Sequence, residues 1–198
     1  MYDNKYINQA NAPYIAAIVL IILAFSSIWM TWINIKVKVY GSSYEETVDF
    51  TDILETDEEY TGYSNKLDDY SSGMSEVISE SKYDDILNSY HAMKYAGIAG
   101  YILLLLTAVC TFINKKAMTV ASILSTLAFA VSTTGGILYC SKTKSFMEDF
   151  TKEFIGGTIP IDYEFHINIG IIIPLAASLI ITIIGLKIKN NDEISEYY

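Results

Sequence analysis

The sequence predicts an integral membrane protein that is mainly α-helical, in which a four-transmembrane-helix bundle carries a small extracellular β-sheet from the two outer loops. Composition and charge carry this prediction. The chain of 198 residues is 52% hydrophobic and only 18% charged, yet its formal net charge is -10. A disordered acidic chain would be poor in apolar residues, and a soluble domain rarely has so few charges. The apolar and the acidic residues must therefore occupy different segments.

Four apolar runs account for the composition, over residues 13–35, 93–113, 117–139 and 167–186. Each is close to the roughly 20 residues that a helix needs to cross about 30 Å of hydrocarbon. The runs contain no Asp or Glu, and their one charged residue, Lys94, lies at an edge. We expect four transmembrane helices, with residues 114–116 as a tight inner turn between the second and third.

The first run could instead be a cleaved signal peptide, because Ala24-Phe25-Ser26 fits a small-x-small cleavage pattern. Its apolar stretch is longer than a signal sequence uses, and its basic region is weak. Trp29 and Trp32 at its far end are typical of interfacial anchors. We therefore expect this run to be retained as a span.

Lysine density predicts the orientation. An even number of spans places the terminal segments 1–12 and 187–198 on one side, together with the turn at 114–116. Lysines are denser on that side, although the other side has more of them in total. By the positive-inside rule we expect both termini in the cytoplasm and a cell-membrane location, with the reverse orientation as the alternative.

The net charge belongs to one outer loop, residues 36–92. It contains 14 acidic residues against four lysines, a balance of -10, whereas the rest of the chain has nine residues of each sign. All 13 basic residues are lysines. This composition argues against a nucleic-acid partner, which requires a basic face.

The first outer loop begins with strand signals. Four aliphatic residues alternate with polar ones from Ile33 to Val39, Gly41-Ser42-Ser43 is typical of a turn, and Val48 and Phe50 continue the alternation. We expect a two-stranded ribbon, then an acidic loop over residues 55–73. Ser81 and Asp84 fit a capping box, so the second helix should begin outside the membrane.

The second outer loop, residues 140–166, predicts a longer third helix and one more strand. Phe146, Phe150 and Phe154 recur at four-residue spacing, and Gly156-Gly157 would end the helix. Apolar residues then alternate from Ile159 to Phe165, directly before the fourth span. Pro160 would suit an edge position.

This order of elements resembles the claudin-like tetraspan architecture. The resemblance covers the whole chain as topology only, because the first outer loop has no Trp and no Cys and so lacks the claudin signature Trp…Gly-Leu-Trp…Cys…Cys. It implies outer strands packed as a small sheet above a four-helix bundle.

Candidate ligand-binding residues are few. Asp57, Glu59, Thr61, Asn65 and Asp68 match the calcium positions of an EF-hand register, but position 8 is polar and no helix precedes the segment. A solvated acidic surface is the simpler interpretation. We expect no cofactor.

Neither the histidines nor the cysteines have a diagnostic spacing. His91 and His166 with Glu164 could bind a metal, although interfacial polar side chains are the simpler interpretation. Cys110 and Cys140 belong to opposite ends of the predicted bundle and should not form a disulfide. Cys110 is expected in the core, with palmitoylation as the alternative. No catalytic motif is present, so we do not expect an enzyme.

Small residues at four-residue spacing predict close helix packing. In the third span they form Ala121-x3-Ser125 and Ala128-x3-Ser132-x3-Gly136. The residues that could face this stripe are Gly97 and Gly100 in the second span, and Gly170 and Ala177 in the fourth.

Two functional hypotheses remain. The first is a structural or interaction protein of the lipid bilayer that presents an acidic, tyrosine-rich outer domain to a protein partner or to a second copy. The second is a small channel, transporter-accessory or sensor subunit whose acidic loop concentrates cations. The spans contain hydroxyls but almost no ionisable groups, which disfavours a coupled transporter.

Overall fold

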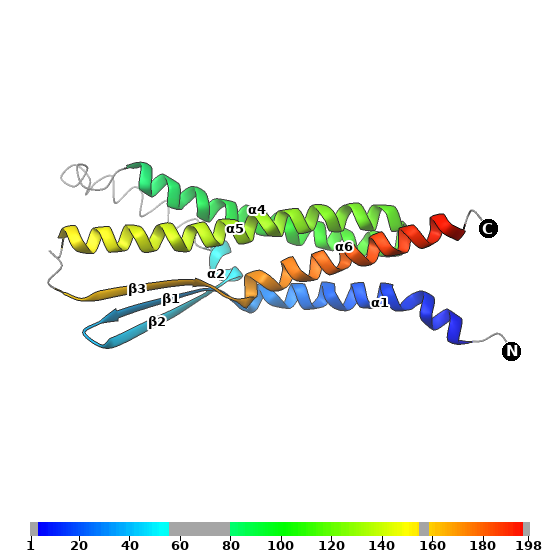
Figure 1. Cartoon of the computed structure of the whole chain (residues 1–198), viewed down its shortest axis with the longest axis horizontal. Coiled ribbons are helices and arrows are strands. Elements are labelled where there is room, and N and C mark those ends of the chain that lie inside the picture. Colours follow the sequence, from blue (N-terminus) through cyan, green and yellow to red (C-terminus); the bar gives the residue numbers. More distant parts are fainter. Residues whose placement is uncertain (1–3, 56–79, 155–158, 196–198) are drawn as a thin grey trace.

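The computed structural model describes residues 4–55, 80–154 and 159–195. The elements, in chain order, are α1 (Asn4–Ser26), the 3-10 helix η1 (Ser27–Trp29), β1 (Thr31–Val39), β2 (Ser42–Asp49), α2 (Phe50–Glu55), α4 (Glu80–Ile113), α5 (Lys115–Phe154), β3 (Ile161–Ile167) and α6 (Ile169–Ser195). The molecule is elongated (Figure 1). One half is a bundle of α1, α4, α5 and α6, and the other half is the sheet, packed along the continuation of α5 beyond the bundle.

Four helices are long and apolar enough to cross a membrane by length and composition. Their outward surface is apolar, with Val19 and Ile22 on α1, Leu105 on α4 and Leu127 on α5 among the exposed side chains. The first residues of α1 and the last residues of α6 lie at the same end of the bundle, opposite the sheet. The predictions of four long apolar helices and of a small sheet are therefore confirmed.

The sheet has three antiparallel strands in the order β2-β1-β3. Tyr40 and Gly41 form the turn between β1 and β2, with φ angles of 50° and 83°. Two successive positive φ angles give the primed turn that matches the twist of a two-residue hairpin. The alternation of β1 sorts its side chains, so that Ile35 and Val37 lie on one face and Lys36 and Lys38 on the other.

The first predicted span differs from the structure at its outer end. The helix ends at Ser26, and β1 begins at Thr31, inside the apolar run predicted over residues 13–35. Trp32 was expected to be an interfacial anchor, but its side chain is fully buried, whereas Trp29 is 71% exposed. Hydrophobicity alone does not separate an apolar helix from the apolar start of a strand, since both bury their side chains.

Two further boundaries differ in detail. Phe50, expected in the second strand, is the first residue of α2. The inner turn is a single non-helical residue, Asn114, because its side-chain oxygen accepts hydrogen bonds from the backbone N–H groups of Lys116 (2.9 Å) and Ala117 (3.4 Å). This N-cap starts α5 immediately after α4 ends.

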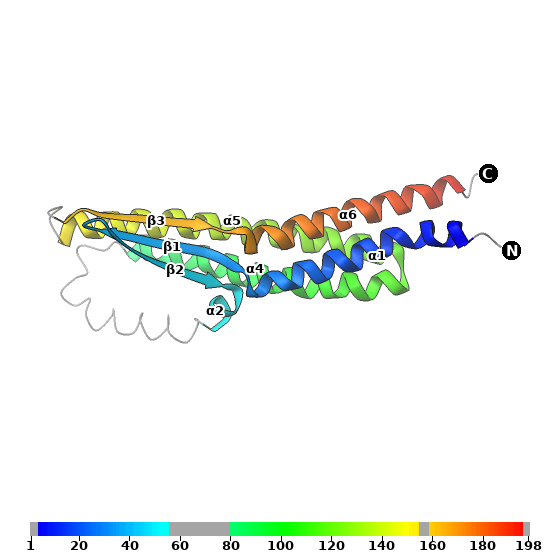
Figure 2. The ribbon, with the colours of Figure 1, turned by 90° about the horizontal axis from the view of Figure 1, so that it is seen from below.

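The two long helices extend beyond the bundle as the sequence indicated. α4 begins at Glu80, and α5 continues to Phe154. Figure 2 shows the sheet running alongside the extension of α5. Lys82 of α4 and Asp149 of α5 form an ion pair at 2.9 Å there, which joins the two helices near their sheet-side ends.

Candidate functional site

An aromatic cluster joins the sheet to the bundle. Trp32 of β1 stacks on Phe50 of α2 with ring centroids 4.4 Å apart, and Phe50 lies 5.3 Å from Tyr101 of α4. Tyr101 meets Phe129 of α5 edge to face at 5.0 Å. All four side chains are buried. Because aromatic pairs of this geometry add to the stability gained from burial, the cluster fixes the base of the sheet on the bundle.

Polar groups inside this cluster are paired. The indole N–H of Trp32 donates to the backbone oxygen of Ser27 at 3.0 Å, and the Ser27 hydroxyl lies 2.8 Å from the Tyr101 hydroxyl. A Cβ atom on Gly97 would lie 2.8 Å from the Phe50 ring, and one on Gly170 would lie 2.5 Å from the Thr31 carbonyl oxygen. Glycine at both positions therefore leaves space for the strand and for α2.

α2 is fixed at its start by reciprocal capping. The Asp49 carboxylate accepts hydrogen bonds from the Thr51 hydroxyl and from the Asp52 backbone N–H, and the Asp52 carboxylate accepts one from the Asp49 N–H. Burial raises the pKa of Asp49, but these hydrogen bonds outweigh it and hold the pKa below its ordinary value. The cap turns the chain from β2 into α2 within one residue.

The end of α2 is fixed to α4. The Tyr90 hydroxyl donates to the backbone oxygen of Ile53 at 2.7 Å, and the Lys94 ammonium donates to that of Leu54 at 3.0 Å. Lys94 is only 3% exposed. A cation near a helix C-terminus is favourable because the last carbonyl groups lack partners within the helix. The position from which the acidic segment 56–79 leaves α2 is thus set by α4.

The apolar face of the sheet packs on α5. Tyr163 of β3 is buried, and its hydroxyl lies 2.9 Å from that of Thr151. Phe165 and Phe146 pack against the core from the strand and from the helix. This packing covers the β3 side of the sheet.

The opposite face of the sheet carries alternating charges. Lys36 on the central strand lies between Glu45 of β2 and Glu164 of β3 in the pairing register. The Lys38 ammonium hydrogen-bonds to the Glu164 carboxylate and lies 3.8 Å from that of Asp162. The hydrogen bond from Lys38 holds the pKa of Glu164 below its ordinary value, and the same bond raises the pKa of Lys38.

The β2 side of the sheet is open. Every residue from Ser42 to Thr47 is exposed. Tyr40, at the tip of the hairpin, is 70% exposed, and Tyr44 is 65% exposed. Glu45 and Glu46 are also exposed and lie nearer the base of the sheet. The surface of β2 is therefore both aromatic and acidic. We define the exposed strand Ser42–Thr47 with Tyr40 as the β2 edge.

Of the predicted ligand-binding residues, the structure describes only the two histidines and Glu164. Asp57, Glu59, Thr61, Asn65 and Asp68 lie outside the described residues. His91 is half-buried on α4 and His166 is exposed on β3. Among the described residues no group of three or more His, Cys, Asp or Glu side chains could hold a metal ion. Cys110 and Cys140 are both free, and Cys140 is buried within α5 and does not lie at its end.

The predicted packing residues lie where helices and strands approach one another. The Ser125 hydroxyl donates to the Gly100 backbone oxygen at 3.0 Å, and the Ser132 hydroxyl donates to that of Met93 at 2.7 Å. Ala121 is buried and Ala128 is half-buried. A Cβ on Gly100 would collide with Phe129 of α5, and one on Gly136 with Ile171 of α6. Gly170, expected to face the third span, instead faces Thr31 and Trp32.

Sequence reasoning missed two contributors to this arrangement. A Cβ on Gly135 would lie 2.6 Å from the backbone nitrogen of Met93, the closest approach of α5 to α4 backbone among the glycines described. Lys94 looked like a residue at the edge of a span, yet it anchors α2. Its lysine type within an apolar run was a signal, since such a group needs a partner.

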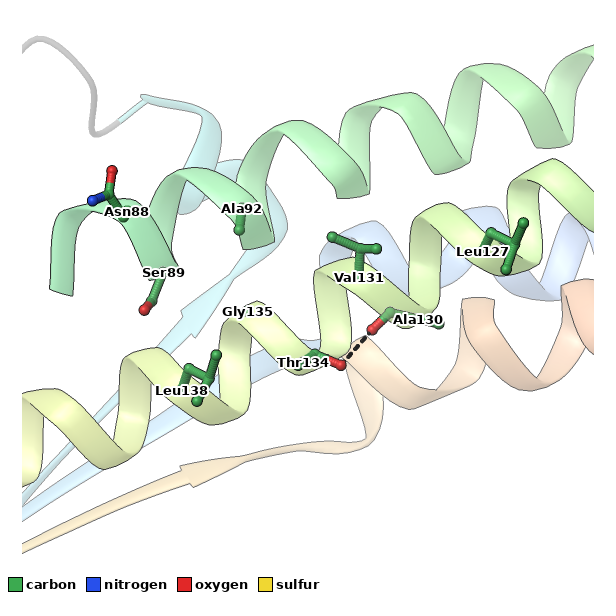
Figure 3. A pocket seen from close by; sticks show the side chains of 9 residues that line it. All are labelled: Asn88, Ser89, Ala92, Leu127, Ala130, Val131, Thr134, Gly135 and Leu138. Carbon is green, nitrogen blue, oxygen red and sulfur yellow. Dashed lines mark hydrogen bonds between the residues drawn. The ribbon is translucent and has the colours of Figure 1, made fainter. Parts of the chain in front are cut away.

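A shallow groove of about 540 Å³ runs between α4 and α5. Figure 3 shows its lining, with Asn88 and Ser89 at the end nearer the sheet and Leu127 at the other end. The Thr134 hydroxyl in this lining donates to the Ala130 backbone oxygen at 2.8 Å. The lining of the groove is open and mainly apolar, which is compatible with contact to hydrocarbon chains. The residues that line the groove include no pair of groups for acid-base chemistry.

A scan against protein-family models found no family that matches this chain, and a search of curated proteins found no similar sequence.

Proposed function

We propose that this chain is a four-span membrane protein of structural or interaction type, which presents the β2 edge and its acidic neighbourhood to a protein partner. The observation that carries the proposal is the contrast between the two ends of the β2 hairpin. Its base is fixed by the aromatic cluster and by α2, whereas every residue of the strand from Ser42 to Thr47 is exposed. A rigid support beneath an exposed surface is what a recognition surface requires.

Insertion in a bilayer accounts for the outward surface of the bundle. The exposed side chains there are large and aliphatic over the length of four helices, and a water-exposed surface of this kind would promote association. We place the sheet outside the cell and both termini in the cytoplasm. In this orientation the arrangement resembles claudin-like tetraspan proteins in topology.

A membrane-impermeant maleimide tests the orientation. Ser43→Cys on the exposed hairpin should be labelled in intact cells, whereas Lys116→Cys at the opposite end should be labelled only after permeabilisation. Both positions are exposed, and the unmodified chain measures the background from Cys110 and Cys140. Labelling of Lys116→Cys alone in intact cells would reverse the assignment.

The hydroxyls of the bundle give little support to the channel alternative. Thr107, Thr111 and Thr182 donate to backbone oxygens one turn earlier in their own helices, at 2.8, 2.8 and 3.0 Å. Hydroxyls engaged in this way satisfy themselves locally and do not make a hydrated path. We therefore do not propose ion conduction, and we propose no enzymatic activity.

Photo-crosslinking in the native membrane tests the interaction itself. A photoreactive amino acid at Tyr44 should give a discrete protein adduct, because Tyr44 lies on the exposed strand. The same amino acid at Val120, which is exposed on the bundle, serves as the control. If Tyr44 gives no adduct, or gives only the adducts of Val120, the proposed presentation of the sheet is wrong.

A further inference from the structure

The two outer strands of the sheet are not equivalent. Both pair with β1 on one side, and in the part of the chain that the structure describes no strand pairs with the other side of either. β3 packs against α5 through the buried Tyr163, whereas every residue of β2 from Ser42 to Thr47 is exposed. An edge strand of this kind presents a row of backbone groups that can pair with another chain.

The register identifies the backbone groups that point outward. Val39 and Ser42 flank a two-residue turn, so they form a hydrogen-bonded pair, and such pairs recur at every second residue. Tyr44 and Glu46 consequently direct their backbone groups toward β1. The N–H and C=O groups of Ser43, Glu45 and Thr47 point away from the sheet.

The pairing of β1 with β2 shows which kinds of side chain lie favourably next to the glutamates of β2. β1 alternates aliphatic residues with Asn34, Lys36 and Lys38, and it is the strand that pairs with the acid-bearing β2 and β3. Lys36 lies opposite Glu45, and Asn34 donates to the Glu45 carboxylate at 2.7 Å. Opposite charges across a strand pair stabilise it.

A second copy of the chain is a poor occupant of this edge. In the antiparallel register that places Ser43 of one copy opposite Thr47 of the other, the outward-pointing Glu45 of each copy faces the other's Glu45. A parallel pair joined through the same outward groups is offset by one residue, and it places Glu45 of one copy beside Glu46 of the other. Like charges directly opposite are destabilising, so the two glutamates oppose self-pairing while they favour a cationic strand.

We propose that the outward edge of β2 binds an extended, lysine- or arginine-bearing segment of a partner protein, which adds to the sheet as a fourth strand beside Ser43, Glu45 and Thr47. This inference rests on the proposed function, because it names the partner chemistry of the same surface. Strand addition takes its affinity from main-chain hydrogen bonds and its selectivity from side chains. Tyr40 and Tyr44 add exposed aromatic area next to the incoming strand.

A peptide titration tests the backbone part of the proposal. The full chain is placed in nanodiscs of zwitterionic lipid and titrated with a fluorescent heptapeptide of alternating valine and lysine, with anisotropy as the readout. Saturable binding is expected, and methylation of alternate peptide nitrogens should weaken it at least about tenfold because methylated amides cannot donate. Equal binding of the methylated peptide would overturn strand addition.

Charge variants of the chain test the selectivity. The double variant Glu45→Lys with Glu46→Lys should weaken binding of the cationic peptide about tenfold or more, and should favour a valine-glutamate peptide instead. The matched control, Asp84→Lys with Glu153→Lys, makes the same change in net charge at exposed positions on α4 and α5. Equal effects of the two double variants would reduce the interaction to bulk charge and overturn the assignment.

Two further outcomes separate this inference from the proposed function. A peptide with the sequence of residues 42–49 should not bind, and binding as tight as that of the cationic peptide would make a second copy the occupant. If no cationic peptide binds while the Tyr44 photo-crosslink persists, the strand-addition inference is wrong and the presentation of the sheet stands. Loss of both would remove the two together.

Discussion

The ammonium group of Lys94, buried on α4, donates a hydrogen bond of 3.0 Å to the backbone oxygen of Leu54 near the end of α2. This contact connects the interior of the bundle with the last described residues before the acidic segment. Together with the hydrogen bond from the Tyr90 hydroxyl to the Ile53 oxygen, it attaches the end of α2 to α4.

Replacement of Lys94 by Met should weaken the attachment of α2 to α4. The methionine keeps most of the apolar stem but removes the donor, so the Leu54 oxygen loses a charged partner at a cost of about 1 to 3 kcal/mol. Hydrogen exchange of the amides in residues 50–55 should quicken, which mass spectrometry of the chain in detergent would measure. Lys116→Met, at an exposed position, is the control. Unchanged protection in Lys94→Met would mean that α2 is held without this bond.

The two tryptophans offer a matched test of the aromatic cluster. Trp32→Ala removes the ring that stacks on Phe50 and should cost about 3 to 5 kcal/mol of unfolding free energy, as large-to-small changes of buried aromatics do. Trp29→Ala removes the same side chain from an exposed position and should change the unfolding free energy little in detergent. Denaturant titration followed by circular dichroism measures both. Similar losses for the two variants would contradict the burial of Trp32.

Periodicity predicted most of the elements because a spacing of two is typical of a half-buried strand and a spacing of three to four is typical of a helix. The alternation predicted from Ile33 to Val39 lies within β1. Of the alternation predicted from Ile159 to Phe165, the part from Ile161 onward lies within β3, which begins directly after Pro160. The four-residue spacing of Phe146, Phe150 and Phe154 lies within α5. The turn at Gly41 followed from its residue type. These signals are local, so a single sequence contains them.

Tertiary relationships were beyond the same reasoning. The burial of Trp32 depends on Phe50 and Tyr101, which approach it only when α2 folds back on α4. The role of Lys94 depends on a carbonyl group 40 positions earlier in the chain. The exposure of β2 depends on strand order, which residue alternation does not encode.

Gly135 should not tolerate a side chain, although alanine is the better helix former. Alanine at this position would gain about 1 kcal/mol in helix propensity. Its Cβ would lie 2.6 Å from the Met93 nitrogen and 3.0 Å from the Ser89 oxygen, both backbone atoms, so α4 and α5 would have to separate. Overpacking of this kind typically costs about 1 to 3 kcal/mol, and we expect a net loss of stability.

Thermal unfolding in detergent checks the prediction for Gly135→Ala. Val131→Ala, one turn earlier and 52% exposed, should leave the melting temperature nearly unchanged. A higher melting temperature for Gly135→Ala than for the wild type would show that the two helices can move apart at no cost and would contradict the close approach.

The ion pair of Lys38 and Glu164 should make the stability of the sheet depend on pH. The pKa of Glu164 is lowered in the folded protein from its ordinary value of 4.5, chiefly by the hydrogen bond from Lys38. A lowered carboxylate pKa contributes stability that is fully present above pH 4.5 and is lost as the pH falls through the folded pKa. The pKa of Lys38 is raised above 10.5, so its contribution persists at neutral pH and disappears only in strong alkali.

Glu164→Gln isolates this contribution because glutamine keeps the shape of the side chain without the charge. Hydrogen exchange of residues 161–167 should be faster in the variant than in the wild type at neutral pH, after correction for the intrinsic exchange rate. The difference should shrink as the pH falls below 4.5, where the wild-type carboxylate also takes up a proton. Lys38→Met should also reduce the pH dependence of exchange in this strand below pH 4.5, since the hydrogen bond that lowers the Glu164 pKa is then absent. A difference that stays constant between pH 7 and pH 3 would show that the pair does not stabilise β3.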